Sequence, residues 1–135
     1  MPIIEDGTKN ARKIRPIIYV IDTSGSMAGT RIAAVNRAMN ETIEGLKDVS
    51  AKNPREEFKI GVLQFASGAS WVHDGLISID DFYWDDLTAG GLSDLGVALD
   101  ELHKRLSSKL FLRGDVGYKT PVLIFISDGD PTDDY

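Results

Sequence analysis

Residues 16–26 read PIIYVIDTSGS, an apolar run that changes abruptly into one carboxylate and two serine hydroxyls. The apolar part, Ile17 to Ile21, is continuous and largely β-branched, which is typical of a strand covered on both faces in a parallel sheet. A second apolar run, VLIFI at 122–126, also ends in polar residues, Ser-Asp-Gly. Ligands of parallel α/β sheets bind beyond the carboxyl ends of the strands. The sequence therefore predicts that both polar ends contribute to one site.

The rest of the chain alternates helical and strand patterns. Apolar residues recur every three or four positions in two segments, which indicates amphipathic helices, the first with Thr30 as its N-cap. The predicted elements after the first strand are a helix at 30–49, strands at 58–65 and 70–73, a loop or short helix at 76–87, a helix from Asp94 to Leu110 and a strand at 121–127. This order predicts a Rossmann-like α/β fold with a mostly parallel central sheet flanked by helices.

Composition limits the class of protein. The 135 residues are 42% hydrophobic and 27% charged, which is typical of one globular domain, here residues 1–135 with a polar lead-in at 1–15. No cysteine is present, so disulfides and thiolate metal sites are excluded. The formal charge of −6 disfavours nucleic acid as a partner. No apolar run approaches the length of a membrane span, and we expect a cytoplasmic protein without membrane contact.

The polar end of the first strand has the chemistry of a hard cation site. Asp22, Ser24 and Ser26 offer only oxygen ligands, which favour Mg²⁺ or Mn²⁺ over zinc or copper. An ion held mainly by neutral hydroxyls and waters keeps much of its positive charge and stays attractive to another carboxylate. An ordinary solvated strand-to-helix turn is the simpler interpretation of these residues taken alone.

Three segments carry a further signal: VIDTSGSM at 20–27, AGGLSDLGVAL at 89–99 and ISDGDPTDD at 126–134. In this order they resemble the von Willebrand factor type A domains, whose metal-ion-dependent adhesion site combines Asp-x-Ser-x-Ser with a later threonine and a later aspartate. The resemblance implies that Ser24 and Ser26 bind the metal directly, and that Asp22 and Asp128 act mainly through waters. Ser93 would take the place of the threonine, in a loop one residue longer than is usual.

The final residues, DGDPTDDY, most resemble the bacterial tellurium-resistance-associated TerY-like branch, whose members are encoded beside kinase- and phosphatase-like proteins. The resemblance implies a protein-binding module, not an enzyme, that captures an Asp or Glu of a partner protein through the ion. In the family, the sheet continues with further strands and helices after the third segment, whereas this sequence ends at Tyr135. An open edge strand that favours a homo-oligomer is therefore expected.

Other functions remain open on the sequence alone. A Mg²⁺-dependent phosphatase-like hydrolase would use Asp22 as its nucleophile, but its usual second aspartate is replaced here by Ser24. The turn before the first helix could instead bind a phosphate, because helix N-termini attract anions. The negative charges of Asp22 and Asp128 would repel that phosphate. A purely structural role would act in assembly through the edge strand. The acids at 80–81 and 85–86 suggest a second cation site or, more simply, a solvated face.

Overall fold

A twisted sheet forms the centre of the molecule, with its main strands in the order β3-β2-β1-β5 and with β4 also paired to β2. The computed structural model describes residues 13–106 and 119–127. The strands are β1 (Lys13–Asp22), β2 (Glu56–Ala66), β3 (Gly68–Trp71), β4 (Ile77–Ser78) and β5 (Val122–Ile126). β1 is parallel to both β2 and β5, whereas β3 and β4 are antiparallel to β2. The predicted α/β fold with a mostly parallel centre is therefore confirmed.

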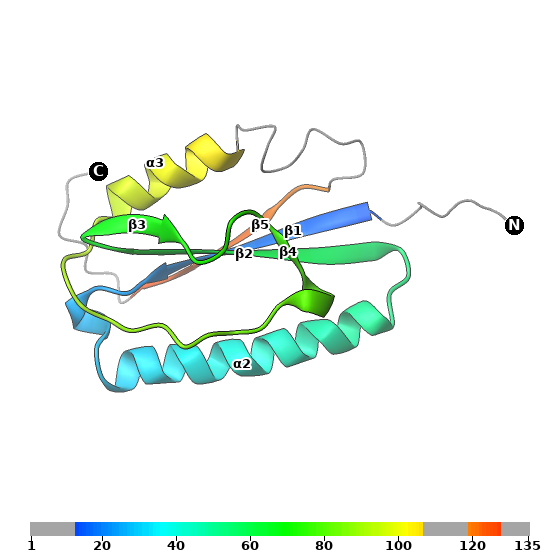
Figure 1. Ribbon diagram of the computed structural model, residues 1–135, viewed down its shortest axis with the longest axis horizontal. Coiled ribbons are helices and arrows are strands. Elements are labelled where there is room, and N and C mark those ends of the chain that lie inside the picture. Colours follow the sequence, from blue (N-terminus) through cyan, green and yellow to red (C-terminus); the bar gives the residue numbers. More distant parts are fainter. Residues whose placement is uncertain (1–12, 107–118, 128–135) are drawn as a thin grey trace, which may run out of the picture.

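In the part of the chain that the structure describes, two helices cover opposite faces of the sheet (Figure 1). They are α2 (Thr30–Ala51) and α3 (Leu95–Leu106), and two short 3₁₀ turns, η2 (Gly25–Met27) and η3 (Ile79–Asp81), lie in the connections. The predicted N-cap of the first helix was wrong by one residue. Gly29 holds that position with a φ of 78°, a left-handed conformation that glycine adopts without strain.

The side chains of β1 alternate between two cores, one under each helix. Ile17, Tyr19 and Ile21 pack on the α2 side, and Ile18 and Val20 on the α3 side. The α2-side core also contains Ile32, Met39, Ile43, Phe58, Ile60, Val62, Ile79, Phe82 and Leu87, and the α3-side core contains Leu63, Phe65, Ala98 and Leu102. Cover on both faces explains why the β1 sequence is apolar without alternation.

The segment predicted as loop or short helix contributes to the fold more than its mixed composition indicates. Within it lie β4 and η3, and Phe82 and Leu87 are both buried in the α2-side core. The strand predicted at 70–73 lies two residues earlier, at Gly68–Trp71, and forms an edge of the described sheet. The second helix is described to Leu106, so the predicted end at Leu110 lies outside the described residues. Neither α2 nor α3 is both long and apolar enough to cross a membrane.

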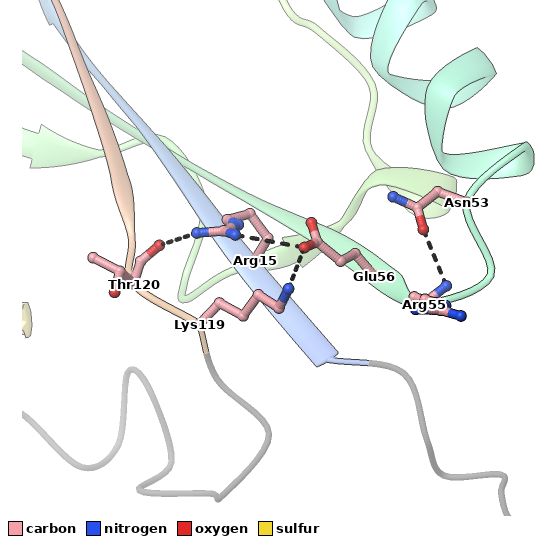
Figure 2. A network of polar contacts seen from close by, with 6 residues as sticks. All are labelled: Arg15, Asn53, Arg55, Glu56, Lys119 and Thr120. Atoms are coloured by element: carbon pink, nitrogen blue, oxygen red, sulfur yellow. Dashed lines mark hydrogen bonds and ion pairs between the residues drawn. The ribbon is translucent and has the colours of Figure 1, made fainter.

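Charged side chains join three strands at the end of the sheet opposite Asp22 (Figure 2). The Arg15 guanidinium donates to the Thr120 carbonyl at 3.0 Å and lies 3.5 Å from the Glu56 carboxylate. The Lys119 ammonium lies 2.6 Å from the same carboxylate. Because Arg15 is on β1, Glu56 on β2 and Lys119 just before β5, this cluster ties together the starts of the three parallel strands.

The cluster predicts a small pH dependence of stability. The hydrogen bond from Lys119, helped by Arg15, holds the pKa of Glu56 below its usual value in the folded state. A folded-state pKa below the unfolded one contributes stability that is present above the unfolded value and is lost as the pH falls through the folded one. We expect less than about 1 kcal/mol, because the pairs are partly exposed to solvent.

Denaturant titrations of the wild type and Glu56→Gln between neutral and acidic pH test this expectation. The difference in unfolding free energy between the two proteins should be present at neutral pH and shrink in the acidic range. A difference that stays constant down to full protonation of the carboxylate would contradict it.

Candidate functional site

Asp22, the last residue of β1, carries a fully buried carboxylate at the centre of a polar cluster. Its Oδ1 accepts a hydrogen bond from the backbone N–H of Ser24 at 2.8 Å, the pattern of an Asx turn. Its Oδ2 accepts from the hydroxyls of Ser93 at 3.2 Å and Ser127 at 3.0 Å. One carboxylate therefore connects three segments that are far apart in the sequence.

Ser24 and Ser26 lie on the turn that leads from β1 into η2. Ser24 has an extended backbone and precedes η2, but its side chain does not cap it. The Ser24 hydroxyl instead lies 3.1 Å from that of Ser26. Ser24 is buried and Ser26 exposed, and Met27 anchors the turn in the interior. The pair of hydroxyls thus runs from the buried carboxylate towards the surface.

Backbone hydrogen bonds join this first loop to the loop before α3. Gly25 N–H donates to the Gly91 carbonyl at 2.8 Å, and Gly90 N–H donates to the Thr23 carbonyl at 2.7 Å. These bonds hold the second loop beside the first and leave Ser93 almost fully buried against Asp22. The extra residue in the loop therefore does not prevent the Ser93 hydroxyl from reaching the cluster.

Gly91 is required for this close approach. Its φ is 90°, and a Cβ built on it would lie 2.7 Å from the hydroxyl oxygen of Ser67. The same hydroxyl accepts a hydrogen bond from the backbone N–H of Leu92 at 2.9 Å. A side chain at Gly91 would therefore both strain the backbone and displace the contact that fixes the second loop.

Four of the five predicted site residues are brought together: Asp22, Ser24 and Ser93 are in direct contact, and Ser26 joins through Ser24. The fifth, Asp128, lies outside the described residues. Ser127 is a cluster member that the predicted set omitted. Its position in the sequence could have indicated this, because Ser127 directly follows β5. The β1–β5 register sets Ile21 beside Ile126, so the next residues, Asp22 and Ser127, lie at the same end of the sheet.

The donor set fits a hard cation. All the side chains that meet here offer oxygen, the type of ligand that Mg²⁺ and Mn²⁺ prefer. Two oxygens at right angles around Mg²⁺, each at about 2.0–2.1 Å, lie about 3 Å apart. The Ser24 and Ser26 hydroxyl oxygens are 3.1 Å apart. Among residues 13–106 and 119–127, no group of three acidic or histidine side chains forms a metal site, and this includes the acids at 80–81 and 85–86.

A shallow groove of about 440 Å³ lies beside the polar cluster. Thr23 and Gly90, from the two joined loops, form part of its wall. The rest comes from the turn between β2 and β3 and its surroundings: Gln64, Ala66, Ser67, Gly68, Ala69 and Ser70. None of these residues is charged, so the groove offers uncharged and mostly small residues next to the cluster.

Comparisons with known proteins agree with this architecture. The family model of the von Willebrand factor type A domain matches residues 17–130. No curated protein matches the chain in sequence.

Similar solved structures include the ArnB paralog VWA2 from Sulfolobus acidocaldarius, with 18% identity over 89% of this chain and a TM-score of 0.59. The N-terminal domains of the type V pili tip protein Mfa5 from Porphyromonas gingivalis share 13% identity over 87% of this chain, with a TM-score of 0.61. The PilB minor pilin from Streptococcus sanguinis shares 16% over 92%, with a TM-score of 0.62.

The matched regions are 28%, 20% and 31% of those three chains, respectively, so this chain spans less than a third of each. At these identities the likeness concerns the fold alone. The family match covers most of the sequence, including the first two loops of the cluster. The chain belongs to the von Willebrand factor type A domain family.

Proposed function

We propose that the domain binds a partner protein through a Mg²⁺ or Mn²⁺ ion held at the polar cluster, as a metal-ion-dependent adhesion site. The observation that supports this most directly is the buried Asp22 carboxylate, which gathers serines from three loops. Ser24, Ser26 and Ser93 would supply hydroxyl ligands, and Asp22, with Asp128, would act through waters. The bound ion would supply a Lewis-acidic site for an Asp or Glu of the partner.

The chain's own residues suit this role in two ways. Asp22 supplies one negative charge, and the serine hydroxyls are neutral, so an ion here would not be fully neutralised by the described residues. The adjacent groove carries no charge that would repel an acidic segment of a partner. Ser26, the exposed member, lies where an incoming carboxylate would approach.

Burial of Asp22 supports a binding role over catalysis. A nucleophilic carboxylate needs an oxygen that substrate can reach. The Asp22 side chain is fully buried, and both of its oxygens already accept hydrogen bonds. We therefore propose that the domain is not an enzyme.

The wider setting of the proposal comes from the sequence at 128–135, DGDPTDDY. On its resemblance we place the domain in the TerY-like branch, in a bacterial tellurium-resistance or stress-associated system in the cytoplasm. Its partners would then be kinase- or phosphatase-like proteins that present an acidic residue.

Metal dependence is tested by thermal unfolding with increasing Mg²⁺, with Mn²⁺ and with a chelator. An ion that binds only the folded state must raise the melting temperature in proportion to the logarithm of its concentration.

Carboxylate capture is tested by calorimetry with a short peptide that contains one Asp, and with its Asn counterpart as the control. We expect binding only for the Asp peptide and only with the ion. Equal binding in the chelator would refute the metal-bridge mechanism.

A further inference from the structure

Leu92 is an exposed apolar residue in the loop that brings Ser93 to the polar cluster. Leu92 is 60% exposed, whereas Ser93, the next residue, is 2% exposed. Because the Ser93 hydroxyl bonds to Asp22, this part of the loop lies at the carboxyl end of β1, beside the proposed ion site. A single exposed leucine is ordinary on a protein surface. The way in which the loop holds Leu92 is not.

Hydrogen bonds to other parts of the chain hold this loop along five consecutive residues, from Gly90 to Asp94. Their partners, in order, are Thr23, Gly25, Ser67, Asp22 and Ala66. The bond from the Leu92 N–H to the Ser67 hydroxyl is 2.9 Å long. Leu92 is thus fixed by its own backbone and by both of its neighbours. A partner that covers this side chain would not have to order the loop first, which lowers the entropic cost of binding.

Leu92 also lies at the rim of the groove beside the polar cluster. The Ser67 hydroxyl accepts from the Leu92 N–H, and the Ala66 carbonyl accepts from the Asp94 N–H at 2.8 Å. Ser67 and Ala66 both belong to the wall of the groove, so the loop runs along that wall. An exposed apolar side chain on a fixed backbone therefore stands between a proposed metal ligand and an uncharged groove. Covering it with apolar atoms of a partner would be favourable.

We propose that Leu92 selects partners that carry an apolar side chain one or two residues from the Asp or Glu that binds the ion. This inference rests on the proposed function, because the ion fixes where the acid of the partner lies. Leu92 directly precedes Ser93, so their Cα atoms are about 3.8 Å apart. In an extended segment, the residues one and two positions from the acid are about 3.8 Å and about 6.5 Å away, which is the same range.

Calorimetry with Mg²⁺ and a set of five short peptides tests the proposal. The reference peptide has one Asp among Ser and Gly residues. The other four each replace one neutral residue with Leu, one or two positions before or after the Asp. We expect at least one Leu peptide to bind the wild type about tenfold more tightly than the reference, as burial of a few methyl or methylene groups would give. Leu92→Ser should remove this gain and leave the affinity for the reference peptide unchanged.

Two further variants serve as controls. Val49→Ser should keep the gain, because Val49 is also an exposed apolar residue but lies near the opposite end of α2. Leu92→Met should keep most of it, because methionine conserves the apolar surface. All three variants should show the wild-type rise of melting temperature with Mg²⁺, since none of them changes a proposed ligand.

The possible failures of this inference and of the proposed function differ. Equal affinity of the wild type for all five peptides, or a gain that survives in Leu92→Ser, overturns the role of Leu92 and leaves the metal bridge in place. Loss of the Mg²⁺ response in Leu92→Ser also overturns it, because Leu92 would then shape the ion site and not contact the partner. A wild type that neither responds to Mg²⁺ nor binds any Asp peptide overturns the proposed function and this inference with it.

Discussion

Asp22→Ala is expected to lower the free energy of unfolding by about 3–5 kcal/mol and to abolish stabilisation by Mg²⁺. The substitution removes the acceptor of three hydrogen bonds, from Ser24 N–H and the Ser93 and Ser127 hydroxyls. Ser24 and Ser93 are buried, so water cannot easily replace the lost acceptor. Each buried donor left unsatisfied costs about 1–3 kcal/mol.

Asp22→Asn separates the structural role of this side chain from its proposed role towards the ion. Asparagine has nearly the same side-chain size as aspartate, and its amide oxygen can still accept the hydrogen bond from Ser24 N–H. Its amide can donate to the hydroxyls of Ser93 and Ser127, which rotate to accept. We therefore expect a small loss of stability without metal, about 1 kcal/mol, but no rise of the melting temperature with Mg²⁺, because the negative charge is gone.

Urea unfolding in chelator measures the change in the free energy of unfolding without metal. Melting temperature against Mg²⁺ concentration measures the response to the ion. A wild-type Mg²⁺ response in Asp22→Asn would show that the carboxylate charge is not needed and would remove the main support for the proposed site. A stable Asp22→Ala protein would instead contradict the hydrogen-bond argument.

β1, β2, β5 and the first loop could be predicted because their signals are local. Ile17 to Ile21 is apolar at every position, and a strand with helices on both faces requires this pattern. The place of Ser93 was also predictable by resemblance, despite the longer loop. The physical reason includes Gly91, whose φ of 90° and missing side chain let the second loop lie against Ser67 and hydrogen-bond to the first loop through Gly25.

Other features were not predictable because their partners lie far away in the sequence. Asn36 is a polar residue in the second turn of α2, and its amide donates to the Leu87 carbonyl and accepts from the Leu87 N–H and the Trp84 indole. These bonds hold the long connection between η3 and α3 against the helix. An isolated asparagine on a helix carries no sign of such a contact, and this explains why the segment around Leu87 was predicted only as loop or short helix.

Phe65→Ala is expected to lower the free energy of unfolding by about 3–5 kcal/mol, a loss as large as that of Asp22→Ala but with a different cause. The ring of Phe65 is 2% exposed and packs in the α3-side core with Ile18, Leu63 and Leu102. Its removal leaves a cavity that the close-packed sheet and helix can only partly fill. Denaturant unfolding in chelator measures the effect.

The site should survive this loss, because Phe65 supports it through its backbone. The Phe65 carbonyl accepts from both the N–H and the hydroxyl of Thr23, at 2.8 and 3.3 Å, and alanine keeps that carbonyl. Folded Phe65→Ala should therefore still gain melting temperature with Mg²⁺, whereas Asp22→Asn, although more stable, should not. Phe65→Leu is the matched control and should lose only about 1 kcal/mol, because it conserves most of the buried volume. Loss of the Mg²⁺ response in Phe65→Ala at temperatures where it is folded would mean that core packing, and not the backbone alone, positions the loop of Ser24 and Ser26.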